Sequence, residues 1–201
     1  MLMSSSETLG IGPLVRHPAL AAIALEAIAS WSNVEAFLLR LFIQVLGGNE
    51  SLAASVYLSL EGQSAKTSAI SAAAANALAA RGQELQVLEA LLSIAKTNEK
   101  ERNKLAHWAW GDSPNLPDAL LLLNPRVHIE NLDASQIYVY REQDFRSIIQ
   151  ANDRLCGFAM DLEFVLSGHV ANRDGRLLDR LAHEPEIAER LMRQAARATQ
   201  Q

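Results

Sequence analysis

An arginine, an asparagine and a histidine lie close together in the sequence at Arg102, Asn103 and His107. They come at the end of a stretch whose apolar residues recur with helical spacing. Each residue of an α-helix is rotated by about 100° from the one before, so Asn103 and His107 share a line, with Glu99 one turn earlier and Arg102 beside it. Histidine transfers protons near neutral pH and arginine binds anions, so this line predicts a face that meets a cleft, a partner or solvent.

The sequence lacks the motifs of several other chemistries. Gly10-Ile11-Gly12 is not followed by the glycine and lysine of a phosphate-binding loop. The histidines are scattered and have no paired cysteines, so they do not form a zinc motif. No serine lies in a nucleophile elbow. We therefore predict no metal site and no cofactor.

Length and composition favour one helical domain with appendages. The chain has 201 residues, of which 49% are hydrophobic and 20% are charged, enough for one good core. Alanine is abundant and aromatic residues are few, which favours closely packed helices. The formal net charge of −5 argues against an extended basic surface for nucleic acid, so any such site must be local.

Helical periodicity identifies the main elements. A long amphipathic pattern covers residues 19–46, with Pro18 near its start and Gly47-Gly48 at its end. Further patterns predict helices over residues 52–60, 64–80, from about 84 into the motif stretch ending at Trp110, and 143–167. The turn-rich residues 111–114 follow the motif helix.

The most apolar stretch, residues 19–46, does not read as a membrane span. Glu26, Glu35, Arg40 and Gln44 interrupt it, and each would be costly in lipid. The first residues carry no basic region before an apolar run, so no secretory signal is expected. The one cysteine, Cys156, indicates a reducing compartment. We predict a cytoplasmic protein without membrane contact.

The chain changes character after the motif helix and again near its end. Residues 119–123 form a short apolar run, and residues 136–140 are β-branched and aromatic, so we expect a hairpin insert at about 119–141. The predicted fold is a mainly α, up-and-down bundle of about five helices with this hairpin and a helical tail. The predicted divisions are a flexible lead-in at 1–16, a helical domain at 17–170 and a charged helical extension at 171–201. The tail could pack on a neighbouring subunit or form a mobile amphipathic arm.

The residues Arg102-Asn103-x-Leu105-Ala106-His107, followed by Trp108, resemble the Arg-x4-His signature of the HEPN superfamily. The wider layout is similar too. It has a long first helix with Trp31 and Glu35, a helix containing Lys66, the motif helix, a hairpin and a long closing helix. The resemblance covers roughly residues 15–170.

This resemblance implies a helical homodimer in which two motif helices meet. Many catalytic members of the superfamily are metal-independent ribonucleases of toxin, antiviral or RNA-processing systems. By the resemblance, Arg102 would hold the phosphate, His107 would be the acid/base and Asn103 would orient His107 or the phosphate. Cleavage would use the 2′-hydroxyl and leave a 2′,3′-cyclic phosphate. The expected partners are a second copy, RNA and a regulatory protein.

Weaker candidates for substrate binding are Lys104, Glu99 and Glu35, chosen for their charge and placement.

A second hypothesis needs no catalysis. Arg102 and His107 could be polar residues of a structural dimer interface, and Trp108-Ala109-Trp110 could fill the core. The protein would then be a helical module for dimerisation, nucleotide binding or protein binding. The geometry of the dimer distinguishes these hypotheses. Two His107 side chains that face each other across an open groove favour an enzyme, and burial of both beneath Trp108 favours a structural role.

Overall fold

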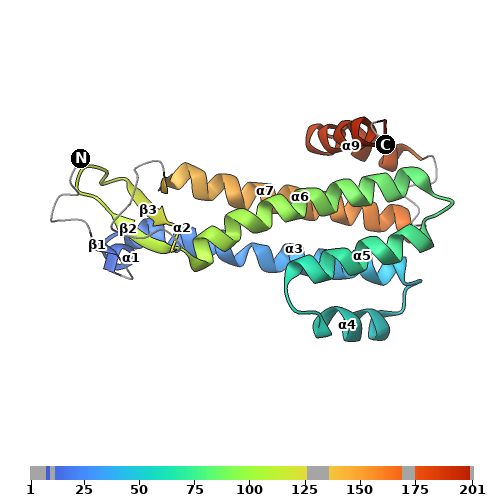
Figure 1. The fold of residues 1–201 in the computed structure, drawn as a ribbon, viewed down its shortest axis with the longest axis horizontal. Helices are drawn as coiled ribbons and strands as arrows, with labels where there is room; N and C mark the ends of the chain where they lie inside the picture. The colour runs from blue at the N-terminus through green and yellow to red at the C-terminus, as the bar shows by residue number, and fades with distance from the viewer. Residues whose placement is uncertain (1–7, 10–11, 126–135, 169–174, 200–201) are drawn as a thin grey trace. The chain divides into compact units, whose positions relative to one another are not determined.

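The computed structural model describes residues 8–9, 12–125, 136–168 and 175–199, and it is mainly helical with a small antiparallel sheet (Figure 1). The mainly helical class is confirmed. The elements are β1 Thr8–Leu9, α1 Gly12–Arg16, α2 Pro18–Ala29, α3 Trp31–Val45, α4 Glu50–Ser59, α5 Gln63–Ala77, α6 Gly82–His107, β2 Ala109–Asp112, β3 Ala119–Leu123, β4 Ile137–Arg141, α7 Glu142–Leu166, α8 Arg176–His183 and α9 Pro185–Ala198.

The described residues form nine helical segments, more than the five predicted. The predicted helix over residues 19–46 is divided at Ser30, whose hydroxyl donates to the carbonyl oxygen of Ala27 at 2.9 Å. A side-chain hydrogen bond to a carbonyl of the preceding turn competes with the backbone hydrogen bonds of the helix. The other four predicted helices correspond to α4, α5, α6 and α7. The remaining segments are α1 and the tail helices α8 and α9.

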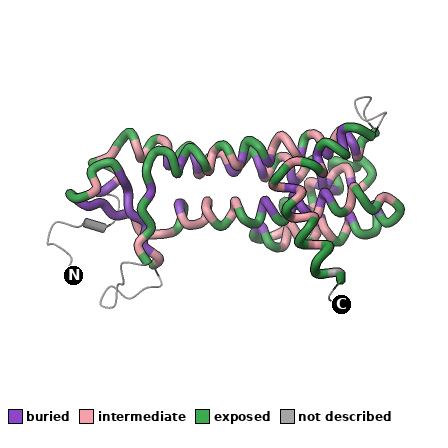
Figure 2. The backbone as a smooth tube through the Cα atoms, turned by 90° about the horizontal axis from the view of Figure 1, so that it is seen from above, coloured by how far each residue is buried: buried purple, intermediate pink, exposed green. Residues whose placement is uncertain are grey.

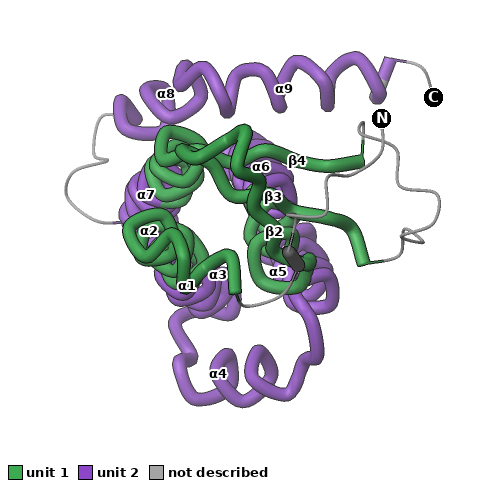
Figure 3. The backbone as a smooth tube through the Cα atoms, turned by 90° about the vertical axis from the view of Figure 1, so that its left-hand side faces the viewer, with its two compact units in different colours: residues 1–31, 98–152 green, residues 32–97, 153–201 purple. Residues whose placement is uncertain are grey.

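The chain groups into two compact units (Figure 3). The first consists of Met1–Trp31 and Asn98–Asn152, and the second of Ser32–Thr97 and Asp153–Gln201. Along the helices, buried and exposed stretches alternate (Figure 2), as expected for amphipathic elements. The domain boundaries predicted at residues 17 and 170 stay a prediction.

The sheet belongs to the first unit and has the strand order β1-β2-β3-β4, all antiparallel. The predicted hairpin is present as β3 and β4, with Ala119 opposite Arg141 and Leu123 opposite Ile137. All five residues of β3 are buried. Backbone groups on such a strand cannot reach water, so β3 requires a neighbour on each side. The strand β2 supplies the second neighbour.

This pairing corrects the predicted end of the motif helix. Trp108-Ala109-Trp110 does not continue the helix, because α6 ends at His107 and β2 begins at Ala109. Gly111 and Asp112 also lie in β2 rather than in the predicted turn. The amide of Trp108 still donates to the carbonyl of Lys104 at 3.0 Å, after which the chain extends along β3. Pairing with a distant strand therefore overrides the local helical pattern.

Part of the predicted flexible lead-in forms structure. Thr8 and Leu9 pair with Asp112 and Gly111, and α1 follows. Arg16 holds Asp112 with two bonds, at 2.7 Å from Nε and 2.8 Å from Nη2. A nearly buried carboxylate requires such a partner. Residues 1–7 and 10–11 lie outside the described part of the chain.

A fully buried, hydrogen-bonded asparagine belongs to the first unit. Asn152 is 0% exposed, donates to Ser30 Oγ at 2.8 Å and accepts from Asn98 Nδ2 at 3.1 Å. We expect Asn152→Ala to lower the free energy of unfolding by about 1–3 kcal/mol, because it leaves two polar groups without their partner. Denaturant unfolding followed by tryptophan fluorescence measures this, since all three tryptophans belong to this unit. An effect no larger than that of the exposed Gln150→Ala would contradict the prediction.

The second unit pairs the charges of α3 within itself. Glu35 binds Lys66 at 3.1 Å, and Arg40 binds Glu163 at 2.8 Å.

By length and composition alone, the stretch Pro18–Val45 is apolar enough to cross a membrane, and 33% of its most apolar window is buried in the protein. Core helices pass this same test. The predicted absence of membrane contact stays a prediction.

The C-terminal tail is helical as predicted, and it packs on its own unit. Arg180 binds Asp161 of α7 at 2.7 Å, and Glu186 of α9 binds Arg154 of α7 at 2.8 Å. Its buried apolar residues are Leu177, Leu178, Leu181 and Ile187. These contacts bury part of the tail's apolar face, while Met192 stays 66% exposed. The two alternatives, packing on a neighbouring subunit and a mobile amphipathic arm, stay predictions.

Cys156 lies half-buried on α7. Burial, and to a smaller extent the charge of Asp153, raises the pKa of its thiol to about 11. A raised pKa leaves little reactive thiolate near neutral pH, which suits a packing role for this residue.

Candidate functional site

The predicted site lies on the last three turns of α6. Arg102 Nη1 donates to Asn103 Oδ1 at 3.1 Å, and Asn103 Nδ2 donates to Glu99 Oε1 at 3.3 Å. The helix itself creates the second contact, because residues four apart lie on the same face. Glu99, Asn103 and Arg102 therefore form a short chain of hydrogen bonds along the surface of α6.

His107 is the last residue of α6, one turn beyond Asn103, and it is exposed. It makes no hydrogen bond or ion pair within the described part of the chain. Trp108 does not cover it, since that ring is half-buried and meets the Tyr138 ring edge-on at 5.3 Å between centroids. The imidazole is therefore accessible to a substrate or a partner.

Arg102 is half-buried, and its Nε atom is buried without a hydrogen-bond partner among the described residues. Buried polar atoms in folded proteins are almost always paired, so an orphan one calls for an explanation. An acceptor outside the described residues would supply it.

Of the weaker candidates, Glu35 does not join the motif. It belongs to α3 in the second unit, where its carboxylate binds Lys66 and its carbonyl oxygen accepts from Tyr57 Oη at 3.4 Å. The role predicted for Glu35 in substrate binding stays a prediction. Glu99 remains part of the motif through Asn103.

Lys104 lies on the side of α6 that faces β4. Its Nζ atom binds Glu101 Oε1 at 2.7 Å and lies 4.7 Å from the centroid of the Tyr138 ring. The other carboxylate oxygen of Glu101 accepts from Tyr140 Oη at 3.0 Å. Burial, and then the charge of Glu101, raises the pKa of Tyr140, so this hydroxyl stays protonated.

These residues line a groove of about 300 Å³, which we call the Tyr138 groove. Its walls include Glu101, Lys104, Tyr138, Tyr140, Asp144 and Ser147. The sequence indicated a strand at Tyr138 and Tyr140 but did not indicate a site there. Their contact with α6 depends on the sheet pairing, which no local pattern reveals.

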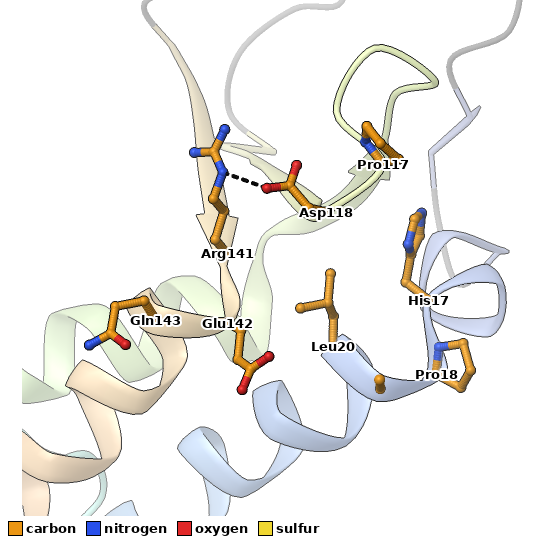
Figure 4. Close-up of a pocket in the computed structure, with 9 residues that line it drawn as sticks. His17, Pro18, Leu20, Pro117, Asp118, Arg141, Glu142 and Gln143 are labelled. Carbon is orange, nitrogen blue, oxygen red and sulfur yellow. Dashed lines mark hydrogen bonds and ion pairs between the residues drawn. The ribbon is translucent and has the colours of Figure 1, made fainter.

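A larger pocket of about 510 Å³ lies between α2, β4 and the loop before β3, all in the first unit (Figure 4). Arg141 points toward Asp118 and binds it at 3.0 Å, while Leu20 and Pro18 form an apolar wall. Its remaining charged residue, Glu142, is paired with Arg146 at 2.6 Å. No motif residue lines this pocket, and its charges already have partners, so the motif is the better candidate site.

In the part of the chain that the structure describes, no three residues of the types His, Cys, Asp and Glu group together in a way that could hold a metal ion. A scan against protein-family models, a search of curated proteins and a search of solved structures each find no match to this chain.

Proposed function

We propose that the protein is a metal-independent endoribonuclease that acts as a homodimer, as the resemblance of its motif to the HEPN superfamily implies. The observation that supports this most is the exposed His107 at the end of α6, one turn from the Arg102 and Asn103 pair. An imidazole that has no hydrogen-bond partner among the described residues is suited to proton transfer. We propose the up-and-down arrangement of the helices, predicted from the sequence, together with this function.

In the proposed reaction, the 2′-hydroxyl of RNA attacks the neighbouring phosphorus atom and the 5′-oxygen leaves, which produces a 2′,3′-cyclic phosphate. One His107 would take the proton of the 2′-hydroxyl, and a second would give a proton to the leaving oxygen. Arg102 would stabilise the charge on the phosphate, and Asn103 would orient its guanidinium. No step requires a metal ion or a cofactor.

Helical geometry favours a site completed by a second copy. Arg102 and His107 are five residues apart, which places them about 140° apart around the helix axis. One copy therefore does not direct both groups at the same point. Two motif helices that meet would bring the Arg102 of one copy to the His107 of the other. Arg102 Nε, which has no hydrogen-bond partner among the described residues, would then find an acceptor in the second copy.

The alternative is a module that dimerises or binds a nucleotide or a protein without cleavage. It is favoured by the hydrogen bonds from Arg102 to Asn103 and from Asn103 to Glu99, which already occupy these side chains. The net charge of −5 also disfavours strong RNA binding. Whether the protein is an enzyme or a binding module, we propose that it is cytoplasmic. If it acts as a toxin or in a defence system, we also propose a regulatory protein partner.

The test is cleavage of single-stranded RNA by the purified protein in EDTA, with DNA of the same sequence as the control. We expect the RNA to be cut with a 2′,3′-cyclic phosphate at the new end, and the DNA to stay intact because it lacks the 2′-hydroxyl. Sedimentation analysis of the same sample should give a dimer. Intact RNA, or cleavage that EDTA abolishes, would overturn the proposal.

A further inference from the structure

The Tyr138 groove contains an aromatic side chain that the core does not use. Tyr138 and Tyr140 lie on the same face of β4, but Tyr140 is buried and stacks on Phe145 at 5.6 Å, whereas Tyr138 is 42% exposed. Lys104 lies against the Tyr138 ring, and Trp108 meets it edge-on. The strand therefore presents one core aromatic and one surface aromatic.

The groove is continuous with the proposed catalytic surface along α6. Lys104 and His107 are three residues apart, so their side chains are neighbours on the helix. Trp108, which contacts Tyr138, follows His107 directly. A chain of nucleotides that crosses the end of α6 at His107 would next meet the Lys104 ammonium and then the Tyr138 ring.

We infer that the Tyr138 groove binds one unpaired base of single-stranded RNA, which stacks on Tyr138 beside the cleavage site. This inference rests on the proposed ribonuclease function. Aromatic side chains next to a cation are the usual means of binding single strands, because every base has a flat face and every nucleotide has a phosphate. A local site of this kind suits a protein with a net negative charge.

The acidic residues of the groove define which base fits. Both carboxylate oxygens of Glu101 accept hydrogen bonds, one from Lys104 and one from Tyr140. Asp144 accepts only through Oδ2, from the amide of Arg141 at 2.8 Å. The other oxygen of Asp144 has no hydrogen bond within the described residues. A carboxylate oxygen accepts from an amino group, which cytosine carries at a position where uracil has a carbonyl oxygen. The groove should therefore bind cytosine more tightly than uracil.

The experiment measures RNA binding separately from cleavage. His107→Ala protein, in which cleavage should be at least about 100-fold slower, is titrated with fluorescently labelled oligocytidine and followed by fluorescence anisotropy at fixed salt. Adding Tyr138→Ala should weaken binding by about 5- to 150-fold, the range found for one stacked base. Adding Tyr138→Phe, which keeps the ring, should change the affinity by less than twofold.

An unchanged affinity in Tyr138→Ala would overturn the inference, as would equal losses in the alanine and phenylalanine variants. A shift of the monomer–dimer equilibrium by Tyr138→Ala without a loss of RNA binding would also overturn it, since a second copy would then occupy the groove. The proposed function is decided independently, by whether the unmodified protein cuts RNA in EDTA. Binding that depends on Tyr138, in a protein that never cuts, would support this site and overturn the enzyme.

The preference of the groove for cytosine over uracil provides a second test. Oligocytidine should bind about 2- to 12-fold more tightly than oligouridine, the range for one hydrogen bond, and Asp144→Asn should reduce this preference. Asparagine retains an oxygen for the amide of Arg141, so the start of α7 keeps its hydrogen bond. Equal affinities for the two oligonucleotides would overturn the assignment of Asp144.

Discussion

Replacement of His107 by alanine should lower the rate of RNA cleavage in EDTA by about 100- to 10,000-fold, the usual contribution of a general acid or base. The side chain is exposed and makes no contact with the described residues that would hold the fold together. The variant should therefore unfold at the same denaturant concentration as the unmodified protein. Initial rates on a labelled RNA of about ten nucleotides measure the effect.

The matched control is His183→Ala. His183 is also exposed and also ends a helix, α8, but it lies in the second unit and far along the sequence from the motif. Its replacement should leave the cleavage rate unchanged. Equal rates for His107→Ala and the unmodified protein would show that the motif is not the catalytic site. A shifted dimer equilibrium with no cleavage in any sample would instead favour the non-catalytic module.

The largest expected loss of stability comes from Phe145→Ala. Phe145 is 0% exposed on α7, stacks on Tyr140 at 5.6 Å and lies 6.4 Å from the Trp110 ring. Removing a fully buried phenylalanine leaves a cavity, and we expect the free energy of unfolding to fall by about 3–5 kcal/mol. Tryptophan fluorescence during denaturant unfolding reports this loss, because all three tryptophans belong to the first unit and the Trp110 ring is a neighbour of Phe145.

Two further variants make this result specific. Phe145→Leu keeps most of the apolar volume, so it should cost clearly less than alanine. Gln143→Ala, at an exposed position on the same helix, should have almost no effect. If Phe145→Ala were no more destabilising than Gln143→Ala, the aromatic cluster of Trp110, Tyr140 and Phe145 would not hold the sheet to α7.

The helices could be predicted well because their signals are local. The side chain of Asn49 accepts from the amide of Leu52 at 3.0 Å and so caps the start of α4, a contact between residues three apart in sequence. Gly168, at a φ of 71°, follows the end of α7, where a residue with a side chain would be strained. The hairpin was predictable for the same reason, since both strands have strand-forming residues between turn residues.

The candidate site was predictable only in part. The line of Glu99, Asn103 and His107 follows from helical spacing, and the structure keeps it on one face of α6. The sequence did not reveal that Lys104 would turn toward Tyr138, or that Glu35 would bind Lys66 in the second unit. Long charged side chains choose partners among residues that are distant in sequence, so their contacts depend on the completed fold.

By itself, therefore, the sequence determined the helical class, most helix boundaries and the residues of the Arg102 to His107 motif, because hydrogen bonds and side-chain neighbours in a helix join residues three or four apart. Only the tertiary structure decided that the chain leaves the helix after His107 and pairs with β3. The reason is that the buried strand β3 needs backbone partners on both sides. That pairing places Trp108 and Tyr138 together and leaves His107 exposed at the end of α6.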